Sequence, residues 1–382
     1  MSTIQTNAIV DASGGNTTTV NGHNITSSNM MGRNLIINGA MKVAQRGTSV
    51  STSSTGYKTV DRFYIEANGS TPTVTISQDT ASTPDTFTQA LKLQVTSTAT
   101  PSGFNIAQKI EGYNFSSAGF GKTTAKNITL SFWVRSSITG TYSTAAMNST
   151  ANRSYVSEYT INTADTWEKK TITIDGDTTG TWPSTSGMSL QLFFCLDNDG
   201  GSFTTSTIGS WIASNKYAGS ANQVNWAGTN GATFYITGVQ LEVGDTSTDF
   251  EHRSYGEELM LCSRYYQRTQ ADNDNYKHFG LVFIGADTGS TSYGTLAVPL
   301  VTTMRTVPSL ETTGNLSNYH LWVKNTSTAL SNFSVDTGID DGTINGQFYL
   351  NAYASVSAGA GSCGAVRANN TSSAFVALDA EL

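Results

Sequence analysis

The stretch NITLSFWVRSS, residues 127–137, alternates between apolar and polar side chains with a period of two. Ile128, Leu130, Phe132 and Val134 share one phase of this alternation, and mostly polar residues occupy the other. Because successive side chains of a β-strand point to opposite faces of a sheet, the pattern predicts a strand that buries one of its faces.

The same alternation recurs along the chain, separated by segments rich in Gly, Asn, Ser and Thr. Further strands are expected within residues 57–67, 72–79, 90–98, 167–177, 188–201, 232–244, 277–289, 291–314, 320–325, 346–359 and 374–382. Gly238 interrupts one alternation and predicts a bulge or a bend. Strands that recur between turn signals are typical of antiparallel sandwiches. We therefore expect a mainly β protein: a jelly-roll-like antiparallel β-sandwich over residues 33–249, then a second, C-terminal β-sandwich module over 270–382.

One helix is expected between these modules, in FEHRSYGEELMLCSRYYQR, residues 250–268. Ser254 followed three residues later by Glu257 is a capping-box pattern, and Arg268 would lie near the negative end of the helix dipole. The segment 250–269 is thus predicted to be a linking helix. The helix cap and the domain junction are expected to involve His252, Arg253, Ser254 and Glu257.

The composition limits the classes of function. Charged residues make up 13% of the chain, the net charge is −7, and the sequence pI is near 5.1. Binding to phosphate backbones needs clustered Lys and Arg, so no nucleic-acid partner is expected. We also expect no signal peptide and no membrane insertion, because no leader pattern and no apolar run of about 18 residues occurs.

Spacing singles out no cofactor or metal site. Cys195, Cys262 and Cys363 are too widely spaced for a metal pair or a disulfide framework. SSAGFGKTT, residues 116–124, lacks the first Gly of a phosphate loop and predicts a surface turn. LDNDGG, residues 196–201, offers oxygen atoms to calcium but lacks the later Glu of a full calcium loop, which favours an Asx turn. No cofactor is therefore expected.

Catalysis on a polysaccharide would need two carboxylates about 5–10 Å apart. Glu111, Glu158, Glu168 and Asp197 are available, and nothing in the sequence pairs any two of them. The long repeats of a solenoid are missing too. We therefore expect no enzyme activity.

Aromatic side chains are the best candidates for binding, because an aromatic plane can pack on the apolar face of a sugar ring. Trp133 and Trp167 adjoin strand residues and are expected in the core. The candidate glycan contacts are Trp182, Trp211 and Trp226 in the first module, and Tyr319, His320, Trp322 and Tyr349 in the second. The alternative is that these aromatic residues fill space between subunits.

Residues 1–32 are polar and hold only two short candidate strands, too little for a core of their own. Such a segment is expected either to stay loose or to find partners from other chains.

Four stretches carry a resemblance to a known group of proteins: NLIINGAMKVAQRGTS (34–49), TLSFWVRSS (129–137), FYITGVQLEVG (234–244) and FEHRSYGEELMLCSRYYQ (250–267). They resemble structural proteins of tailed bacteriophages, many labelled tail fibre or virion structural proteins, with marine and cyanobacterial viruses well represented. The resemblance covers roughly residues 33–310 and is weaker beyond. It implies a homotrimer, an N-terminal segment fixed to the virion and β modules that project toward a host surface, and it brings no catalytic motif.

These observations predict a non-enzymatic bacteriophage tail fibre or receptor-binding virion protein, located in the virion tail and extracellular after release from the host cell. Residues 1–32 would dock on another tail or baseplate protein, and the C-terminal module would contact host cell-surface polysaccharide. A purely architectural virion protein (baseplate, collar or capsid decoration) is the first alternative. A polysaccharide depolymerase is the second.

Overall fold

The chain folds into two compact units of antiparallel β-structure. The computed structural model describes residues 19–20, 23–24, 32–84, 86–271, 276–287, 292–335, 343–344, 347–355 and 362–382. The first unit contains the described residues up to 42, together with 49–56 and 63–253; the second contains 43–48, 57–62 and 254–382. The boundary at residues 253 and 254 lies within the segment expected to link the modules.

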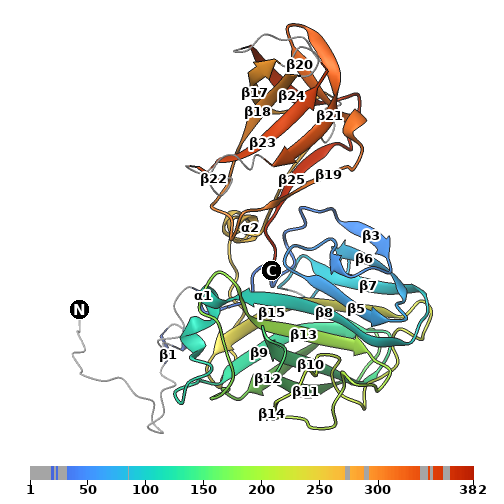
Figure 1. The fold of residues 1–382 in the computed structure, drawn as a ribbon. Helices are drawn as coiled ribbons and strands as arrows, with labels where there is room; N and C mark the ends of the chain where they lie inside the picture. The colour runs from blue at the N-terminus through green and yellow to red at the C-terminus, as the bar shows by residue number, and fades with distance from the viewer. Residues whose placement is uncertain are drawn as a thin grey trace, which may run out of the picture. The chain divides into compact units, whose positions relative to one another are not determined.

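The first unit is a sandwich of two sheets (Figure 1), and its long strands pair antiparallel. The seven-stranded sheet consists, in spatial order, of β14 (Trp211–Ile212), β11 (Ser154–Ile161), β10 (Gly140–Asn148), β13 (Met188–Asp197), β8 (Pro101–Glu111), β5 (Tyr64–Gly69) and β4 (Gly56–Tyr57). The six-stranded sheet consists of β12 (Glu168–Ile174), β9 (Ile128–Ser136), β15 (Thr233–Val243), β7 (Ala90–Ser97), β6 (Thr73–Asp79) and β3 (Ser49–Thr52). The short helices α1 (Gly112–Phe115) and η1 (Ser116–Ala118) connect β8 to β9.

The alternating residues of β9 lie in the core between these sheets, as predicted. Ile128, Leu130, Phe132 and Val134 are all fully buried. The Phe132 ring meets the Phe194 ring of β13 edge to face, with centroids 5.1 Å apart. The period of two therefore identified the apolar residues of this strand that face the core, and Thr129 and Ser131 of the other phase are buried as well.

The predicted bulge at Gly238 is confirmed. The register between β15 and β9 shifts between Thr237 and Gln240. Gly238 has φ +61°, and a Cβ atom there would lie 2.6 Å from Cζ of Phe87. Only glycine meets both requirements without strain, because the conformation is left-handed and the space is already filled.

The second unit has a three-stranded and a seven-stranded antiparallel sheet (Figure 1). The smaller consists of β16 (Tyr266–Gln270), β25 (Phe375–Asp379) and β19 (Ser309–Thr312). The larger consists of β18 (Ser292–Pro299), β17 (His278–Asp287), β24 (Cys363–Ala368), β20 (Tyr319–Val323), β21 (Thr326–Val335), β23 (Gln347–Ala354) and β22 (Thr343–Ile344), with η2 (Leu316–Asn318) before β20. β18 pairs with β23 as well as with β17, so the larger sheet closes on itself. Leu321, Leu350 and Val366 fill its interior.

The predicted helix is real but ends earlier than expected. α2 spans Tyr255–Ser263, and the Ser254 hydroxyl accepts a hydrogen bond from the Glu257 amide (3.2 Å), as the capping-box pattern indicated. The prediction that the helix continues to residue 268 is wrong. Residues 266–270 form β16 and pair with β25, so Arg268 lies in a strand. A sheet partner more than 100 positions away in the sequence outweighs local helix propensity here.

The N-terminal segment contributes one short pairing to the described structure. β1 (Thr19–Val20) and β2 (His23–Asn24) pair antiparallel. The rest of the segment up to residue 31 lies outside the described residues, so its docking role stays a prediction.

A charge cluster in the second unit ties the early segments 43–48 and 57–62 to the end of the chain. The Arg62 guanidinium is 1% exposed and pairs with the Glu381 carboxylate. The Arg46 guanidinium lies 3.4 Å from the same carboxylate and 2.9 Å from that of Asp379. The two guanidinium groups stack on the rings of Tyr265 and Tyr266, at 3.6 and 3.5 Å from the ring centroids. Nothing in the sequence analysis anticipated this cluster.

Asp61, beside this cluster, predicts a pH dependence of stability. Burial raises the pKa of its carboxyl group to about 6, although hydrogen bonds from the Gln45 amide and side chain (2.9 and 2.6 Å) oppose the shift. Since the pKa in an unfolded chain is about 3.9, folding favours the protonated form. This stabilisation is complete below about pH 4 and is lost as the pH rises through about 6.

We therefore expect the free energy of unfolding of the second unit to include a component that falls between about pH 4 and 6. Asp61→Asn removes the titrating group and should flatten that part of the profile. Urea unfolding at a series of pH values, followed for both proteins, measures the difference. Parallel profiles for the two proteins would show that Asp61 does not titrate in this window.

Candidate functional site

Two of the predicted glycan contacts in the first unit lie together in an aromatic cluster. Trp182 is in the loop between β12 and β13, and Trp211 is in β14. Their ring centroids lie 5.5 Å apart with the planes nearly perpendicular. The buried Phe120 ring is edge-on to both, at 4.9 and 5.8 Å. Both indoles are partly exposed, so they form the outer layer of the cluster.

The polar edge of each indole is fixed by the backbone. Nε1 of Trp182 donates to the carbonyl oxygen of Thr179 (3.0 Å), and Nε1 of Trp211 donates to that of Asp175 (2.6 Å). Satisfied indole N–H groups hold the rings in place without needing a ligand. The exposed parts of the rings are thus available for apolar contacts.

An ion pair supports the loop that carries Trp182. The Arg153 guanidinium binds the Asp177 carboxylate through two hydrogen bonds, 2.9 and 2.7 Å long. It also lies 5.9 Å from the Trp211 ring centroid. Burial of Asp177 opposes ionisation, but the bonds from Arg153 and Thr179 prevail and lower the pKa of this carboxyl group. The bidentate geometry therefore fixes the orientation of the loop.

A shallow depression of about 80 Å³ adjoins Trp182, and Ser116, Lys122 and Ser184 lie among its polar lining residues. Enclosed small-molecule sites are usually about 300–1,000 Å³, so this depression suits contact along a surface rather than engulfment. Tyr113 of α1 is 61% exposed, and its amide donates to the Thr185 carbonyl oxygen (3.0 Å), which places α1 against the loop of Trp182. Tyr113 was not among the sequence candidates, because its only signal was an aromatic residue outside an alternating run.

Two predicted glycan contacts are buried, and those predictions are wrong. Trp226 is fully buried and stacks on Phe104, with centroids 5.9 Å apart. Tyr319 is fully buried inside the second unit, where its hydroxyl donates to the Phe375 carbonyl oxygen (2.5 Å) and accepts from the Thr313 amide (3.0 Å). A polar sequence neighbourhood does not expose a large ring when the fold offers an apolar space for it.

The other predicted contacts of the second unit lie in two places. His320 and Trp322 are on β20. Tyr349 is on β23, two strands along the closed sheet, and is partly buried. Trp133 and Trp167 of the first unit, expected in the core, are also only partly buried.

Two of the predicted junction residues make contacts within the first unit. The His252 ring packs against the rings of Phe87 and Phe250, at 5.4 and 4.9 Å. The Arg253 guanidinium donates to the carbonyl oxygens of Asn34 and Ile36. Both residues thus anchor the last segment of this unit before α2 begins.

The remaining sequence candidates have structural partners. Asn198 and Asp199 each accept a hydrogen bond from an amide two residues ahead (3.0 and 2.8 Å), which confirms the Asx-turn interpretation. The Glu158 carboxylate accepts from the Ser220 hydroxyl, and that of Glu168 accepts from Lys170 Nζ (2.6 Å).

The described residues contain neither a cluster of metal ligands nor a membrane-spanning helix. No group of three or more His, Cys, Asp or Glu is placed to hold a metal ion. No helix within that part of the chain is long and apolar enough to cross a membrane.

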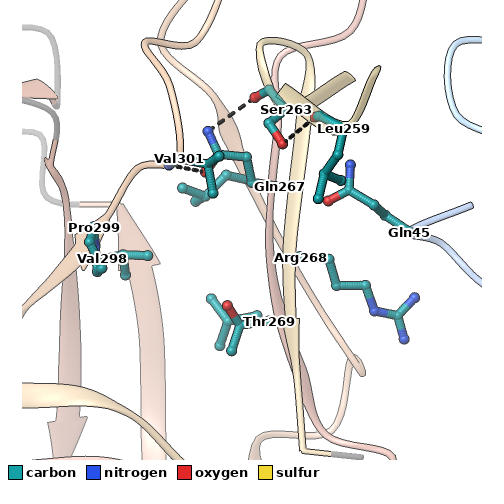
Figure 2. A pocket seen from close by; sticks show the side chains of 11 residues that line it. Gln45, Leu259, Ser263, Gln267, Arg268, Thr269, Val298, Pro299 and Val301 are labelled. Carbon is teal, nitrogen blue, oxygen red and sulfur yellow. Dashed lines mark hydrogen bonds between the residues drawn. The ribbon is translucent and has the colours of Figure 1, made fainter. Parts of the chain in front are cut away.

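A larger cavity, of about 190 Å³, lies in the second unit between α2, β16, the end of β18 and the segment that follows it (Figure 2). Its wall includes Val298, Pro299 and Val301. Gln267 donates to the carbonyl oxygens of Ser263 and Thr302 (3.0 and 3.1 Å) and accepts from the Val301 amide (2.9 Å). Because the Gln267 side chain already bonds to three backbone groups, it is not available to a ligand, and we do not assign the cavity a function.

Comparison with known proteins adds a limited similarity of fold. No protein-family model and no curated protein matches this sequence. Among solved structures, the chain is similar to the enzymatically active domain of tailspike protein 4 from bacteriophage CBA120, at 11% identity and a TM-score of 0.31, over 55% of this chain and 21% of that one. It is also similar to a protein from Bacteroides thetaiotaomicron described as sugar-binding (12%, TM-score 0.31, 55% and 99%). A family 11 carbohydrate-binding module from Clostridium thermocellum, solved with a mixed-linked tetrasaccharide, is a third (12%, TM-score 0.26, 54% and 98%). Scores this low assign no function.

Proposed function

We propose that this chain is a carbohydrate-binding virion protein without enzyme activity, acting as a bacteriophage tail fibre or receptor-binding protein. The observation that carries the carbohydrate part is the surface cluster of Trp182 and Trp211. The virion part rests on the sequence resemblance described above. In this proposal the chain is a homotrimer, docks through residues 1–32 on another virion protein, and contacts polysaccharide on the host cell surface.

The chemistry of the cluster fits a saccharide. A pyranose ring has an apolar face of C–H groups and a rim of hydroxyls. The indole rings can contact the C–H face, because their polar N–H groups are already bonded to the backbone. Ser116, Ser184 and Lys122 lie beside Trp182 and can exchange hydrogen bonds with the hydroxyl rim.

Removing either indole should weaken binding about tenfold, which corresponds to about 1.4 kcal/mol. The full-length chain is first applied to an array of bacterial capsular and O-antigen oligosaccharides. Trp182→Ala and Trp211→Ala are then titrated against the oligosaccharide that binds most tightly. Trp167→Ala is the matched control, because Trp167 is a partly exposed tryptophan of the same unit outside the cluster.

Thermal unfolding of each variant separates lost binding from lost folding. Two results would contradict the proposal: no array saccharide binds the folded chain, or both cluster variants bind as tightly as the Trp167→Ala control. Release of reducing ends from the bound saccharide would instead favour a depolymerase. Light scattering tests the trimer, which should have three times the mass of one chain.

A further inference from the structure

A second surface, on the outside of the closed sheet of the second unit, combines a row of His and Arg side chains with an apolar row. In the first row, His278 of β17 and His320 of β20 both pair with Arg367 of β24. In the second row, Leu281 and Trp322 both pair with Ala365. The six residues thus form two rows across the same three strands.

A bulge in β17 brings the two rows to the same face. The register shifts between His278 and Gly280. As a result, His278 and Leu281 are both exposed, with Leu281 at 70%, while Phe279 between them is buried and packs near Tyr319 (5.7 Å between ring centroids). Trp322 adds an indole that is 36% exposed.

Arg367 is held in place at the centre of this surface. Its guanidinium lies 5.7 Å from the Trp322 ring centroid and 5.2 Å from that of Tyr276. Its Nη2 donates to the Ser327 hydroxyl (3.1 Å), which also lies 2.7 Å from Nδ1 of His320. Stacking and this hydrogen bond orient the planar guanidinium before any ligand arrives.

The surface presents the positive charge of Arg367 although the chain as a whole carries a net charge of −7. Strands β20, β21 and β24 contain no Asp or Glu. Within the described ranges, no carboxylate forms an ion pair with Arg367. Nε of Arg367 is buried and has no hydrogen-bond partner there. A guanidinium without an ion-pair partner favours a carboxylate ligand, to which its terminal nitrogens can donate hydrogen bonds.

We propose that this surface is a binding site for a carboxylate-bearing sugar, such as a uronic or sialic acid. Arg367 binds the carboxylate, while Trp322 and Leu281 pack on the apolar face of the sugar ring. The site belongs to the second unit and requires an acidic ligand, so it is independent of the tryptophan cluster in the first unit.

The experiment compares each acidic probe with its neutral counterpart on the full-length chain. The probes are trigalacturonate with its methyl ester, and α-2,3-sialyllactose with lactose. We expect at least one acid to bind about tenfold more tightly than its neutral counterpart, and Arg367→Gln to remove that preference. Binding of the acid should also weaken with added NaCl, because an exposed ion pair is screened. Arg135→Gln is the matched control, since that guanidinium also lies near an aromatic ring, 4.9 Å from the centroid of Tyr235.

Any of three binding results would overturn this inference: neither acid binds, the neutral sugars bind equally well, or Arg367→Gln retains the preference. A loss of oligomer mass in light scattering for Leu281→Ala would also overturn it, because the surface would then be an interface between copies of the chain. The Trp182→Ala variant should keep its acid binding, so failure here and failure of the tryptophan cluster are distinguishable.

Discussion

Replacing Glu381 by Gln should lower the free energy of unfolding of the second unit by about 3–5 kcal/mol. Glu381 faces the buried Arg62 guanidinium and also lies within 3.4 Å of Arg46. Removing the carboxylate charge leaves the Arg62 cation buried without its counter-ion. Burying an unpaired charge is among the most costly changes a protein can undergo. Urea unfolding monitored on the second unit measures the loss.

The control is an exposed ion pair. Asp165 is 56% exposed and lies 3.5 Å from Arg135. Changing Asp165 to Asn should lower the free energy of unfolding by about 1 kcal/mol or less. The double change Arg62→Met with Glu381→Leu should recover much of the stability, because well-packed apolar residues can replace a buried ion pair. Equal losses for Glu381→Gln and Asp165→Asn would show that the Arg62 site is open to water.

Trp226→Ala should lower the free energy of unfolding of the first unit by about 3–5 kcal/mol. The indole is fully buried and stacked on Phe104, so alanine leaves a cavity that the surrounding sheet cannot easily close. Denaturant unfolding, followed by a probe in the first unit, measures the change. The result also tests the earlier interpretation of Trp226 as a glycan contact.

Trp322→Ala is the matched substitution at an exposed indole of the second unit, and it should cost about 1 kcal/mol or less. A small loss for Trp226→Ala, similar to that for Trp322→Ala, would contradict the buried placement and restore Trp226 as a candidate contact. In that case its loss should reduce saccharide binding instead of stability.

Local signals predicted the features that depend on a few neighbouring residues. The buried face of β9, the bulge at Gly238 and the Ser254 cap all follow from patterns less than a dozen residues long. The end of α2 was missed because β16 is held by β25, whose residue Asp379 pairs with Tyr266. A pattern read along the chain contains no information about such a distant partner.

For the candidate sites too, local sequence patterns predicted some features, and others depended on distant strands. Loop position selected Trp182 and Trp211, which are partly exposed, but it also selected Trp226, which the fold encloses. Arg367 had no signal at all, because it becomes notable only when β17 and β20 place two histidines beside it. Strand order decides which side chains are exposed and which side chains lie beside them. Strand order itself depends on contacts between residues that are far apart in the sequence.

The sequence by itself determined that this is an antiparallel β protein with one capped helix, because alternation and caps act over short distances. The tertiary structure alone decided which aromatic residues are exposed, how the larger sheet of the second unit closes, and which carboxylate pairs with Arg62. Arg62 and Glu381 lie 319 positions apart. Contacts at that separation form only when the whole chain has folded, since their energy depends on burial that no local segment can provide.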